Sequence, residues 1–205
     1  MASEMVPEPT PQRMSIGAAA FGKCLQDERP PAVASGRVAA PRLGTPTTRD
    51  GASIHALVRD CPPLDLNSVY AYLLLCQHHA ATCVLASLGG HTVGFVSAYR
   101  PPQRLDTIFV WQVAVSPLVR GSGLAKQMLA HLLGREELSD CTHLETTVSP
   151  SNLPSRRLFE ALARDHSATL EESILFPESA FGSTSHEVEM LFRIGPLRPK
   201  ATGGP

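Results

Sequence analysis

Residues 120–125 read Arg-Gly-Ser-Gly-Leu-Ala and lie where an apolar, strand-like run passes into an amphipathic helix. A glycine-rich turn at a helix start presents several backbone N–H groups and the positive end of the helix dipole at one point. Glycine also lets the backbone approach a bulky anion closely, and Arg120 adds a positive charge. The spacing therefore predicts a phosphate-binding turn, although two glycines alone also fit a tight strand-to-helix connection.

The motif around this turn is more specific than its two glycines. It has neither the lysine of the Gly-x-x-x-x-Gly-Lys-Ser/Thr loop nor the third glycine of the dinucleotide fingerprint. The stretch VAVSPLVRGSGLAKQML instead resembles the coenzyme-A motif Gln/Arg-x-x-Gly-x-Gly/Ala of the GNAT acetyltransferase superfamily. Arg120, Gly123 and Ala125 stand in its three fixed places.

The resemblance implies an acetyl-CoA site. In that superfamily the strand before the turn diverges from its neighbour and its free backbone groups bind the pantetheine arm, a role that falls here to Val113 and Val115. The diphosphate is assigned to the backbone of Arg120, Gly121, Ser122, Gly123, Leu124 and Ala125. The segment SPSNLPSRRLFEAL matches the next family motif and places Asn152 against the coenzyme, although a helix-capping asparagine would look the same.

Longer stretches narrow the resemblance. Over about residues 37–194, runs such as GFVSAYRPP, DTIFVWQVAV, LETTVSPSN and EVEMLFRI look like the diaminobutyrate acetyltransferases of ectoine synthesis. This resemblance implies transfer of acetyl from acetyl-CoA to the 4-amino group of L-2,4-diaminobutyrate, whose N4-acetyl product is cyclised to ectoine. It also implies a small-molecule acceptor and a possible homodimer.

Acyl transfer to such an amine makes definite chemical demands. A lysine-like amine with a pKa near ~10.4 is mostly protonated at pH 7, so a carboxylate, a histidine or a bound water must take a proton before attack. The substrate also carries a second ammonium and a carboxylate. The first requires an acidic group, and the second requires a cationic or amide donor.

By resemblance, five residues form the acceptor pocket. Glu189 is the first choice for the general base and Asp65 for holding the second ammonium, although these two roles could be exchanged. His186 accompanies Glu189 as a catalytic candidate, Trp111 opens the coenzyme strand, and Tyr70 is a weaker member. Read singly, Asp65 also fits a helix cap and Trp111 a core position. His186 and Glu189 also fit solvated strand positions.

Two further expectations concern the reacting atoms. The oxyanion should be met by a backbone N–H of the diverging strand near Val113. Many superfamily members protonate the leaving thiolate with a tyrosine in the helix after the asparagine, but this helix carries Phe159. Another group or water must act instead, or the thiolate leaves unassisted, which a thiol pKa near ~8.5 permits at modest cost.

Helical periodicity predicts two helices ahead of the coenzyme strand. After Asp50, which can cap the first helix, the apolar side chains recur at helical spacing: Ile54, Leu57, Val58 and Cys61. The second helix, SVYAYLLLCQHH, is apolar almost all round, which predicts that it is well buried.

The remaining elements complete an alternating pattern. Two β-rich runs flanking Gly89-Gly90 predict a hairpin, and DTIFVWQVAV, a near-continuous apolar run, belongs at the centre of a sheet. Strands are also expected at 37–45, 143–149, 168–176 and 187–194, and helices at 121–135 and 151–164. The pattern predicts an α/β (α+β) fold with a single mixed, mostly antiparallel sheet of six or seven strands flanked by about four helices.

Length and charge bound the class of protein. The 205 residues suffice for one domain, assigned to residues 37–194. Residues 1–36 are expected to be a disordered tail and residues 195–205 a flexible one. A net charge of -1 argues against general attraction to nucleic acid or to an anionic membrane. Neither a membrane span nor a secretory signal is recognisable, so a cytoplasmic protein is expected.

The sequence predicts no metal. The five cysteines are odd in number and share no Cys-x-x-Cys spacing, which favours free thiols: Cys24, Cys61, Cys76, Cys83 and Cys141. The neighbouring His78 and His79 cannot both point along one helical face.

Two alternatives to this interpretation stay open at the level of the sequence. The first is a GNAT enzyme with another acceptor, such as a polyamine, a lysine-like amino acid or a protein N-terminus. The second is a coenzyme-A-binding module without catalysis.

Overall fold

The computed structural model describes residues 40–182 and 186–197, all of which belong to one compact unit. The predicted N-terminal tail lies outside the described residues, as do positions 198–205 of the predicted C-terminal tail. The described part corrects the boundary at residue 194, because β7 (Glu189–Gly195) includes Gly195 and Leu197 is buried. The N–H of Leu197 donates to the carbonyl of Thr142 at 2.6 Å, so Leu197 is part of the fold.

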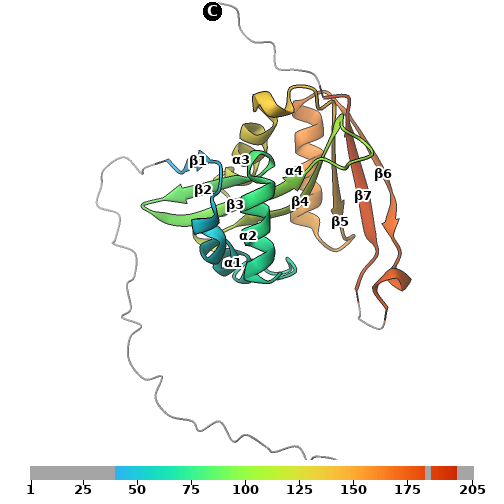
Figure 1. Cartoon of the computed structure of the whole chain (residues 1–205). Coiled ribbons are helices and arrows are strands. Elements are labelled where there is room, and N and C mark those ends of the chain that lie inside the picture. The colour runs from blue at the N-terminus through green and yellow to red at the C-terminus, as the bar shows by residue number, and fades with distance from the viewer. Residues whose placement is uncertain (1–39, 183–185, 198–205) are drawn as a thin grey trace, which may run out of the picture. The chain divides into compact units, whose positions relative to one another are not determined.

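A single seven-stranded sheet organises the described residues, with the strand order β1-β2-β3-β4-β5-β7-β6 (Figure 1). The other strands are β1 (Arg42–Gly44), β2 (Val84–Leu88), β3 (His91–Tyr99), β4 (Thr107–Val115), β5 (His143–Val148) and β6 (Thr169–Phe176). Within this sheet β4 and β5 run parallel and the other neighbours run antiparallel. The predicted mixed, mostly antiparallel sheet is confirmed, with the apolar β4 at its centre.

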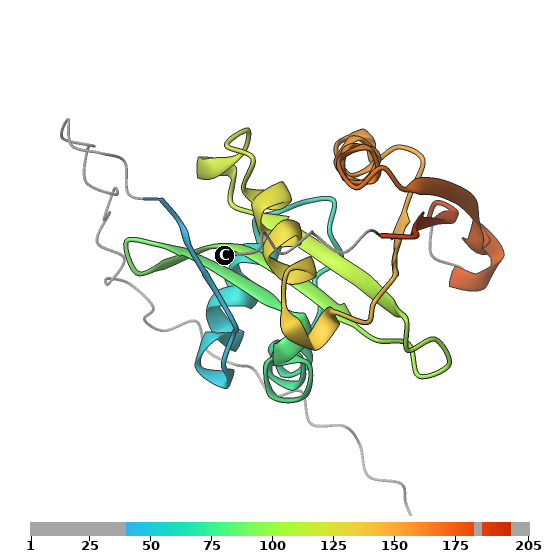
Figure 2. The same ribbon diagram turned by 90° about the horizontal axis from the view of Figure 1, so that it is seen from above.

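Helices cover both faces of the sheet. The described residues form α1 (Gly51–Arg59), α2 (Val69–His78), α3 (Leu124–Leu133) and α4 (Leu153–Asp165). Figure 1 shows α1 and α2 in front of β2–β4 and α3 and α4 behind the sheet. The view from above separates α1 and α2 from α4 across the strands (Figure 2). No helix in these ranges combines the length and the apolar character needed to cross a membrane.

Two apolar clusters hold these layers together. One joins α3 and α4 to the sheet through side chains such as Met128, Leu129 and Phe192. The other joins α1 and α2 to the opposite face and includes Tyr72 and Phe95. The periodic residues of the first predicted helix are all buried in this second cluster: Ile54, Leu57, Val58 and Cys61. Burial of one helical face is the reason that the sequence pattern identified this helix correctly.

The hairpin predicted at Gly89-Gly90 is present. Both glycines have a positive φ, 58° and 84°, and they connect β2 directly to β3. Glycine adopts this left-handed conformation without the strain that a Cβ would introduce. The hairpin pairs β2 with β3, and the other edge of β3 pairs with β4, the strand that leads into the coenzyme motif.

The second helix is less buried than its composition predicted. Tyr72, Leu75 and Cys76 are buried, but the opposite side of α2 exposes Val69, Tyr70 and Leu74. The sheet and α1 cover only one side of this helix. Apolar composition alone could not reveal that the described chain leaves the other side open.

The structure corrects the predicted cap at Asp50 and excludes the alternative of a cap at Asp65. The Asp50 carboxylate does not cap α1 but accepts the N–H of Thr47 at 2.7 Å, one turn earlier. Ser68 caps α2, where its hydroxyl accepts the N–H of Ala71 at 3.2 Å. Asp65 therefore lies in the loop ahead of the helix and does not act as its cap.

Strand β4 separates from β5 halfway along its length. Strand β3 accompanies β4 as far as Val115, whereas β5 is paired with it only up to Val110. The register shift between Ser97 and Ala98 leaves Trp111 as an extra residue in β4, and such a bulge bends the strand. Beyond Val110, the edge of β4 that faces β5 therefore has no strand partner within the described sheet.

A buried carboxylate fastens the half of β5 that remains paired. Glu145 is fully buried, and its Oε1 accepts Nη1 of Arg104 at 2.7 Å and Nη1 of Arg193. Arg104 lies in the β3–β4 connection and Arg193 in β7. A buried carboxylate requires such pairing. Glu145 therefore connects β5 to the β3–β4 connection and to β7, just before β4 and β5 diverge.

Candidate active site

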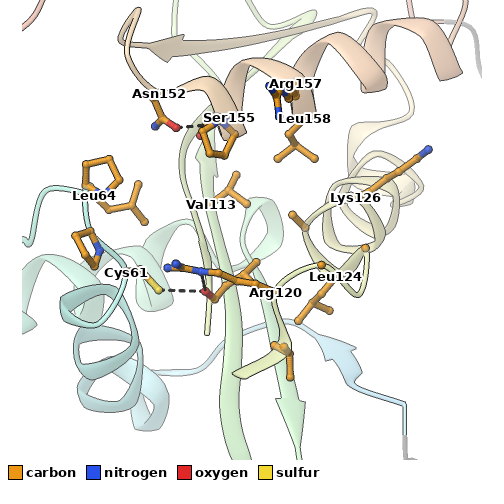
Figure 3. A pocket seen from close by; sticks show the side chains of 18 residues that line it. Cys61, Leu64, Val113, Arg120, Leu124, Lys126, Asn152, Ser155, Arg157 and Leu158 are labelled. Carbon is orange, nitrogen blue, oxygen red and sulfur yellow. Dashed lines mark hydrogen bonds between the residues drawn. The ribbon is translucent and has the colours of Figure 1, made fainter. Parts of the chain in front are cut away.

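A cavity of about 570 Å³ opens beside the separated half of β4 (Figure 3). It is bounded by β4, by the α1–α2 loop, by the turn before α3 and by the first turns of α4. Every residue predicted to bind the coenzyme lines this cavity except Ser122; the lining members are Val113, Val115, Arg120, Gly121, Gly123, Leu124, Ala125 and Asn152.

The predicted phosphate turn has the geometry that its glycines permit. Gly121 and Gly123 have φ values of 76° and 79°, in the left-handed region that strains other L residues. Gly123 is the N-cap residue, so α3 begins at Leu124 and not at Gly121 as predicted. The N–H groups of the first turn of α3 lack carbonyl partners within the helix. They are therefore available to an anion in the cavity.

The lining of the cavity is cationic. Its charged members are Arg120, Lys126 and Arg157, and none of the described residues that line it carries a carboxylate. Lys126 is also paired with Asp165 outside the lining. Together with the start of α3, this charge distribution favours a ligand that carries phosphate groups.

Two side chains converge on the carbonyl oxygen of Val115. Cys61 donates from Sγ at 3.3 Å and Arg120 donates from Nε at 3.2 Å, as the dashed lines in Figure 3 show. Arg120 thus folds its guanidinium back along the strand while its backbone remains in the turn. This contact links the turn to the free half of β4.

Asn152 fulfils the capping role and also faces the cavity. Its Oδ1 accepts the N–H of Ser155 at 3.2 Å, which caps α4, and the residue belongs to the cavity lining. Capping and ligand contact are therefore compatible in this geometry, because the amide nitrogen is not needed for the cap.

A second group of polar side chains gathers beyond the cavity. Nε2 of His186 lies 3.8 Å from Oδ2 of Asp65 and 3.8 Å from Oε1 of Glu189. These residues come from the α1–α2 loop, the segment before β7 and the first position of β7. The structure thus brings together three of the five predicted acceptor residues.

The imidazole of His186 is held in a defined orientation. Nδ1 donates to the carbonyl of Glu187 at 2.7 Å, and the ring stacks on Phe181 with centroids 3.9 Å apart. The hydrogen bond to Glu187 and then the charges of Glu189 and Asp65 raise the pKa of His186 above its usual value. Nε2 therefore faces both carboxylates with an increased tendency to carry a proton.

Trp111 and Tyr70 stand outside this group of ion pairs. Trp111 is the bulged residue of β4 and is 41% exposed, which rules out the core position considered for it. Tyr70 lies in the first turn of α2 and is 68% exposed. Both rings are thus available to a ligand that binds between the α1–α2 loop and β4.

Phe159 lies in the core and not in the cavity. It is 3% exposed and belongs to the cluster beneath α3 and α4, so this position offers no proton donor. Within residues 40–182 and 186–197, no three His, Cys, Asp or Glu side chains gather to hold a metal ion.

The sequence interpretation missed one wall of the cavity and one neighbour of the acceptor group, Phe181. Cys61, Pro62, Pro63 and Leu64 form the wall, and Ser155, Arg157 and Leu158 extend it along α4. Phe181 contacts His186 only through the tertiary fold. The double proline could have signalled a rigid loop, but no local pattern indicates what that loop faces.

Comparison with known proteins agrees with this architecture. Residues 52–163 match the model of the acetyltransferase (GNAT) family. An L-2,4-diaminobutyric acid acetyltransferase of Bordetella parapertussis is 56% identical over 156 residues, covering 76% of this chain and 84% of the relative. One from Vibrio cholerae is 48% identical over 149 residues, covering 73% and 86% of the two chains.

Solved structures give the same result. The diaminobutyrate acetyltransferase EctA from Paenibacillus lautus, solved with L-2,4-diaminobutyric acid and coenzyme A, is 42% identical with a TM-score of 0.75. The match covers 77% of this chain and 96% of that chain. The ribosomal-protein-S18-alanine N-acetyltransferase of Escherichia coli, at 16% identity and a TM-score of 0.57 over 79% and 97% of the two chains, shares the fold alone.

The diverging strand, the phosphate turn and the family match define an N-acetyltransferase of the GNAT family. Within it, the chain belongs to the family of L-2,4-diaminobutyric acid acetyltransferases, as the identity and coverage of these relatives show.

The raised pKa of His186 predicts a pH-dependent contribution to stability. Because the folded pKa lies above the unfolded value of about 6.5, the stabilisation is complete below that pH and is lost as the pH rises through the folded value. Replacing His186→Gln should therefore lower the urea midpoint more at about pH 5.5 than at about pH 8.5. Urea titrations of both proteins across this range measure the difference.

The control introduces His186→Gln into an Asp65→Asn, Glu189→Gln double variant. Without the two carboxylates, the histidine should contribute less and with a weaker pH dependence. A difference that stays constant with pH in the otherwise unaltered protein would contradict the prediction.

Proposed function

We propose that this chain transfers the acetyl group of acetyl-CoA to the 4-amino group of L-2,4-diaminobutyrate. The observation that carries the proposal is the position of a cationic cavity along the free edge of β4. Next to it, the α1–α2 loop contributes Asp65 to an acidic group that also contains His186 and Glu189. Such a pair of sites suits an anionic coenzyme and an amino acid that carries two ammonium groups. The relatives at 42–56% identity support this choice of acceptor.

Acetyl-CoA would lie along β4 with its diphosphate at the start of α3. The backbone of Val113, and the part of Val115 other than the carbonyl that already accepts from Cys61 and Arg120, would bind the pantetheine arm in the manner of a neighbouring strand. The first-turn N–H groups of α3 and the cations of the lining would hold the phosphates. This arrangement directs the thioester toward Trp111 and the acidic group.

The acceptor would bind between Asp65, His186 and Glu189. One carboxylate holds the ammonium that does not react, and Glu189, directly or through water, accepts the proton of the reacting one. Only the neutral form of His186 could accept a proton, and its raised pKa disfavours that form, which supports Glu189 for this role. The exposed rings of Trp111 and Tyr70 would flank the carbon chain of the substrate.

The neutral amine then attacks the thioester carbonyl directly. A new C–N bond forms, and the oxygen carries the negative charge opposite a backbone N–H near Val113. Collapse of this intermediate breaks the C–S bond and releases the coenzyme thiolate. The attacking nitrogen loses its remaining proton as the amide forms, and this proton passes through water to the thiolate, because Phe159 offers no donor; a thiol pKa of ~8.5 keeps the cost of this step small.

The decisive experiment combines product analysis with acidic variants. The protein should convert acetyl-CoA and diaminobutyrate to the N4-acetyl compound, identified by NMR, in preference to polyamines and lysine-like amines. Glu189→Gln should lower kcat on the order of 10²-fold or more, and Asp65→Asn should raise KM for diaminobutyrate roughly tenfold or more. Preference for another amine would reject the acceptor, and coenzyme binding without any acetylated product would reject catalysis.

A second experiment tests the phosphate turn. Gly123→Ala places a side chain at a φ of 79°, which costs roughly 1–2 kcal/mol and disturbs the start of α3. We expect KM for acetyl-CoA to rise by about tenfold, measured by steady-state kinetics. The matched control is Gly89→Ala, which has a φ of 58° in the β2–β3 hairpin away from the cavity. Equal effects of both variants on KM would contradict a specific role for the turn.

We further propose a homodimer, as the family resemblance implies. Leu66, Val69 and Leu74 are exposed on or beside α2, and a second copy would remove this apolar surface from water. Sedimentation analysis at micromolar concentration should give twice the mass of the chain, and Leu74→Arg should reduce it. A monomer across that range would overturn the dimer.

The proposed reaction also locates the protein. Acetyl-CoA is an intracellular co-substrate, which supports a cytoplasmic enzyme. The described cysteines are all free thiols, as a reducing compartment favours: Cys61, Cys76, Cys83 and Cys141.

A further inference from the structure

One buried amide on the coenzyme strand contacts the acceptor loop. Gln112 is 4% exposed and lies between Trp111 and Val113. Its Nε2 donates to the backbone carbonyl of Asp65 at 2.7 Å. Among the described hydrogen bonds of residues 62–67, this is the one that reaches the sheet. The contact therefore connects the two substrate regions.

The other end of the amide is also held. The hydroxyl of Tyr72 donates to Oε1 of Gln112 at 3.4 Å, and the same hydroxyl accepts the N–H of Asn67 at 3.4 Å. Tyr72 is fully buried in α2. Gln112 and Tyr72 thus bind the backbone of the loop at Asp65 and at Asn67, on either side of Leu66.

The backbone of Gln112 is itself fixed at the bulge. Its N–H donates to Oγ of the buried Ser97 on β3 at 3.1 Å, opposite the point where the register shifts. The side chain consequently leaves β4 from a defined position next to Trp111. Burying an amide is unfavourable unless its polar atoms form hydrogen bonds. In Gln112, the amide nitrogen forms this bond with the backbone of the loop.

The side chain of Asp65 has few contacts of its own that would fix its position. The side chain of Asp65 is 84% exposed, and its contact with His186 is 3.8 Å long. Pro62, Pro63 and Leu66 are exposed as well. The backbone hydrogen bond from Gln112 is therefore the short, buried constraint on where the Asp65 carboxylate can lie.

We propose that Gln112 is a positioning residue that sets the Asp65 loop against the coenzyme strand and thereby determines acceptor binding. The inference rests on the proposed function, in which Asp65 holds an ammonium of the acceptor. It assigns to Gln112 no contact with either substrate. Loss of the amide should weaken acceptor binding while leaving the coenzyme site intact.

The test compares Gln112→Met, which keeps the length of the side chain and removes its hydrogen bonds, with the unaltered protein. KM for diaminobutyrate should rise by about tenfold, the loss expected for one buried hydrogen bond, with KM for acetyl-CoA changed by less than about twofold. Ser97→Ala is the matched control, because it removes another buried partner of Gln112 without touching the loop. It should raise KM for diaminobutyrate much less than Gln112→Met does, because the side-chain hydrogen bond from Gln112 to Asp65 remains.

Tyr72→Phe adds a readout that a general loss of stability would not produce. It should raise KM for diaminobutyrate less than Gln112→Met does, and the double variant should fall short of the product of the two single effects, because the hydroxyl and the amide share a hydrogen bond. Additive effects, an unchanged acceptor KM in Gln112→Met, or an equal rise in Ser97→Ala would each overturn the proposal.

Hydrogen exchange separates this proposal from the proposed function. In the free protein, the amide of Asn67 should exchange at least several-fold faster in Gln112→Met than in the unaltered chain. If the unaltered protein does not acetylate diaminobutyrate, the proposed function fails, and faster exchange would support the tether alone. Unchanged exchange would reject the tether whatever the activity.

Discussion

The divergence of β4 from β5 is the constraint on which the rest of the site depends. Parallel pairing ends at Val110, while β3 continues beside β4 to Val115. Backbone N–H and C=O groups are obligatory hydrogen-bonding groups, so the free edge must face water or a ligand with its own amides. The bulge at Trp111 bends the strand at this point, and the pairing of Glu145 with Arg104 and Arg193 fastens the sheet just before it.

Positive and negative side chains are separated on the two sides of this bend. The cavity beyond it contains arginine and lysine side chains and the start of α3. The group around His186 carries two carboxylates. An anionic coenzyme and an amine with two ammonium groups would each meet the opposite charge, and the thioester and the nucleophile would meet where the two regions adjoin. In the proposed reaction, this distribution of charge would orient both substrates before any chemical step.

The α1–α2 loop serves both regions at once. Cys61 and Leu64 belong to the wall of the cavity, whereas Asp65 faces His186. Two hydrogen bonds connect this loop to β4. The thiol of Cys61 in the loop donates to the carbonyl of Val115, and the amide of Gln112 in β4 donates to the carbonyl of Asp65. A short loop held in this way has little freedom to move one site without the other.

Elements with local signals could be predicted from the residues alone. Helical spacing identified α1, the glycine pair identified the β2–β3 hairpin, and the coenzyme motif identified the turn with its positive φ values. Three other features depend on the folded chain: which side of α2 remains exposed, the stacking of Phe181 on His186, and the hydrogen bond from Gln112 to Asp65. These features arise between segments that are far apart in the chain. Periodicity in the sequence predicts local helices and strands, but it does not identify which distant residue will become a neighbour in the folded protein.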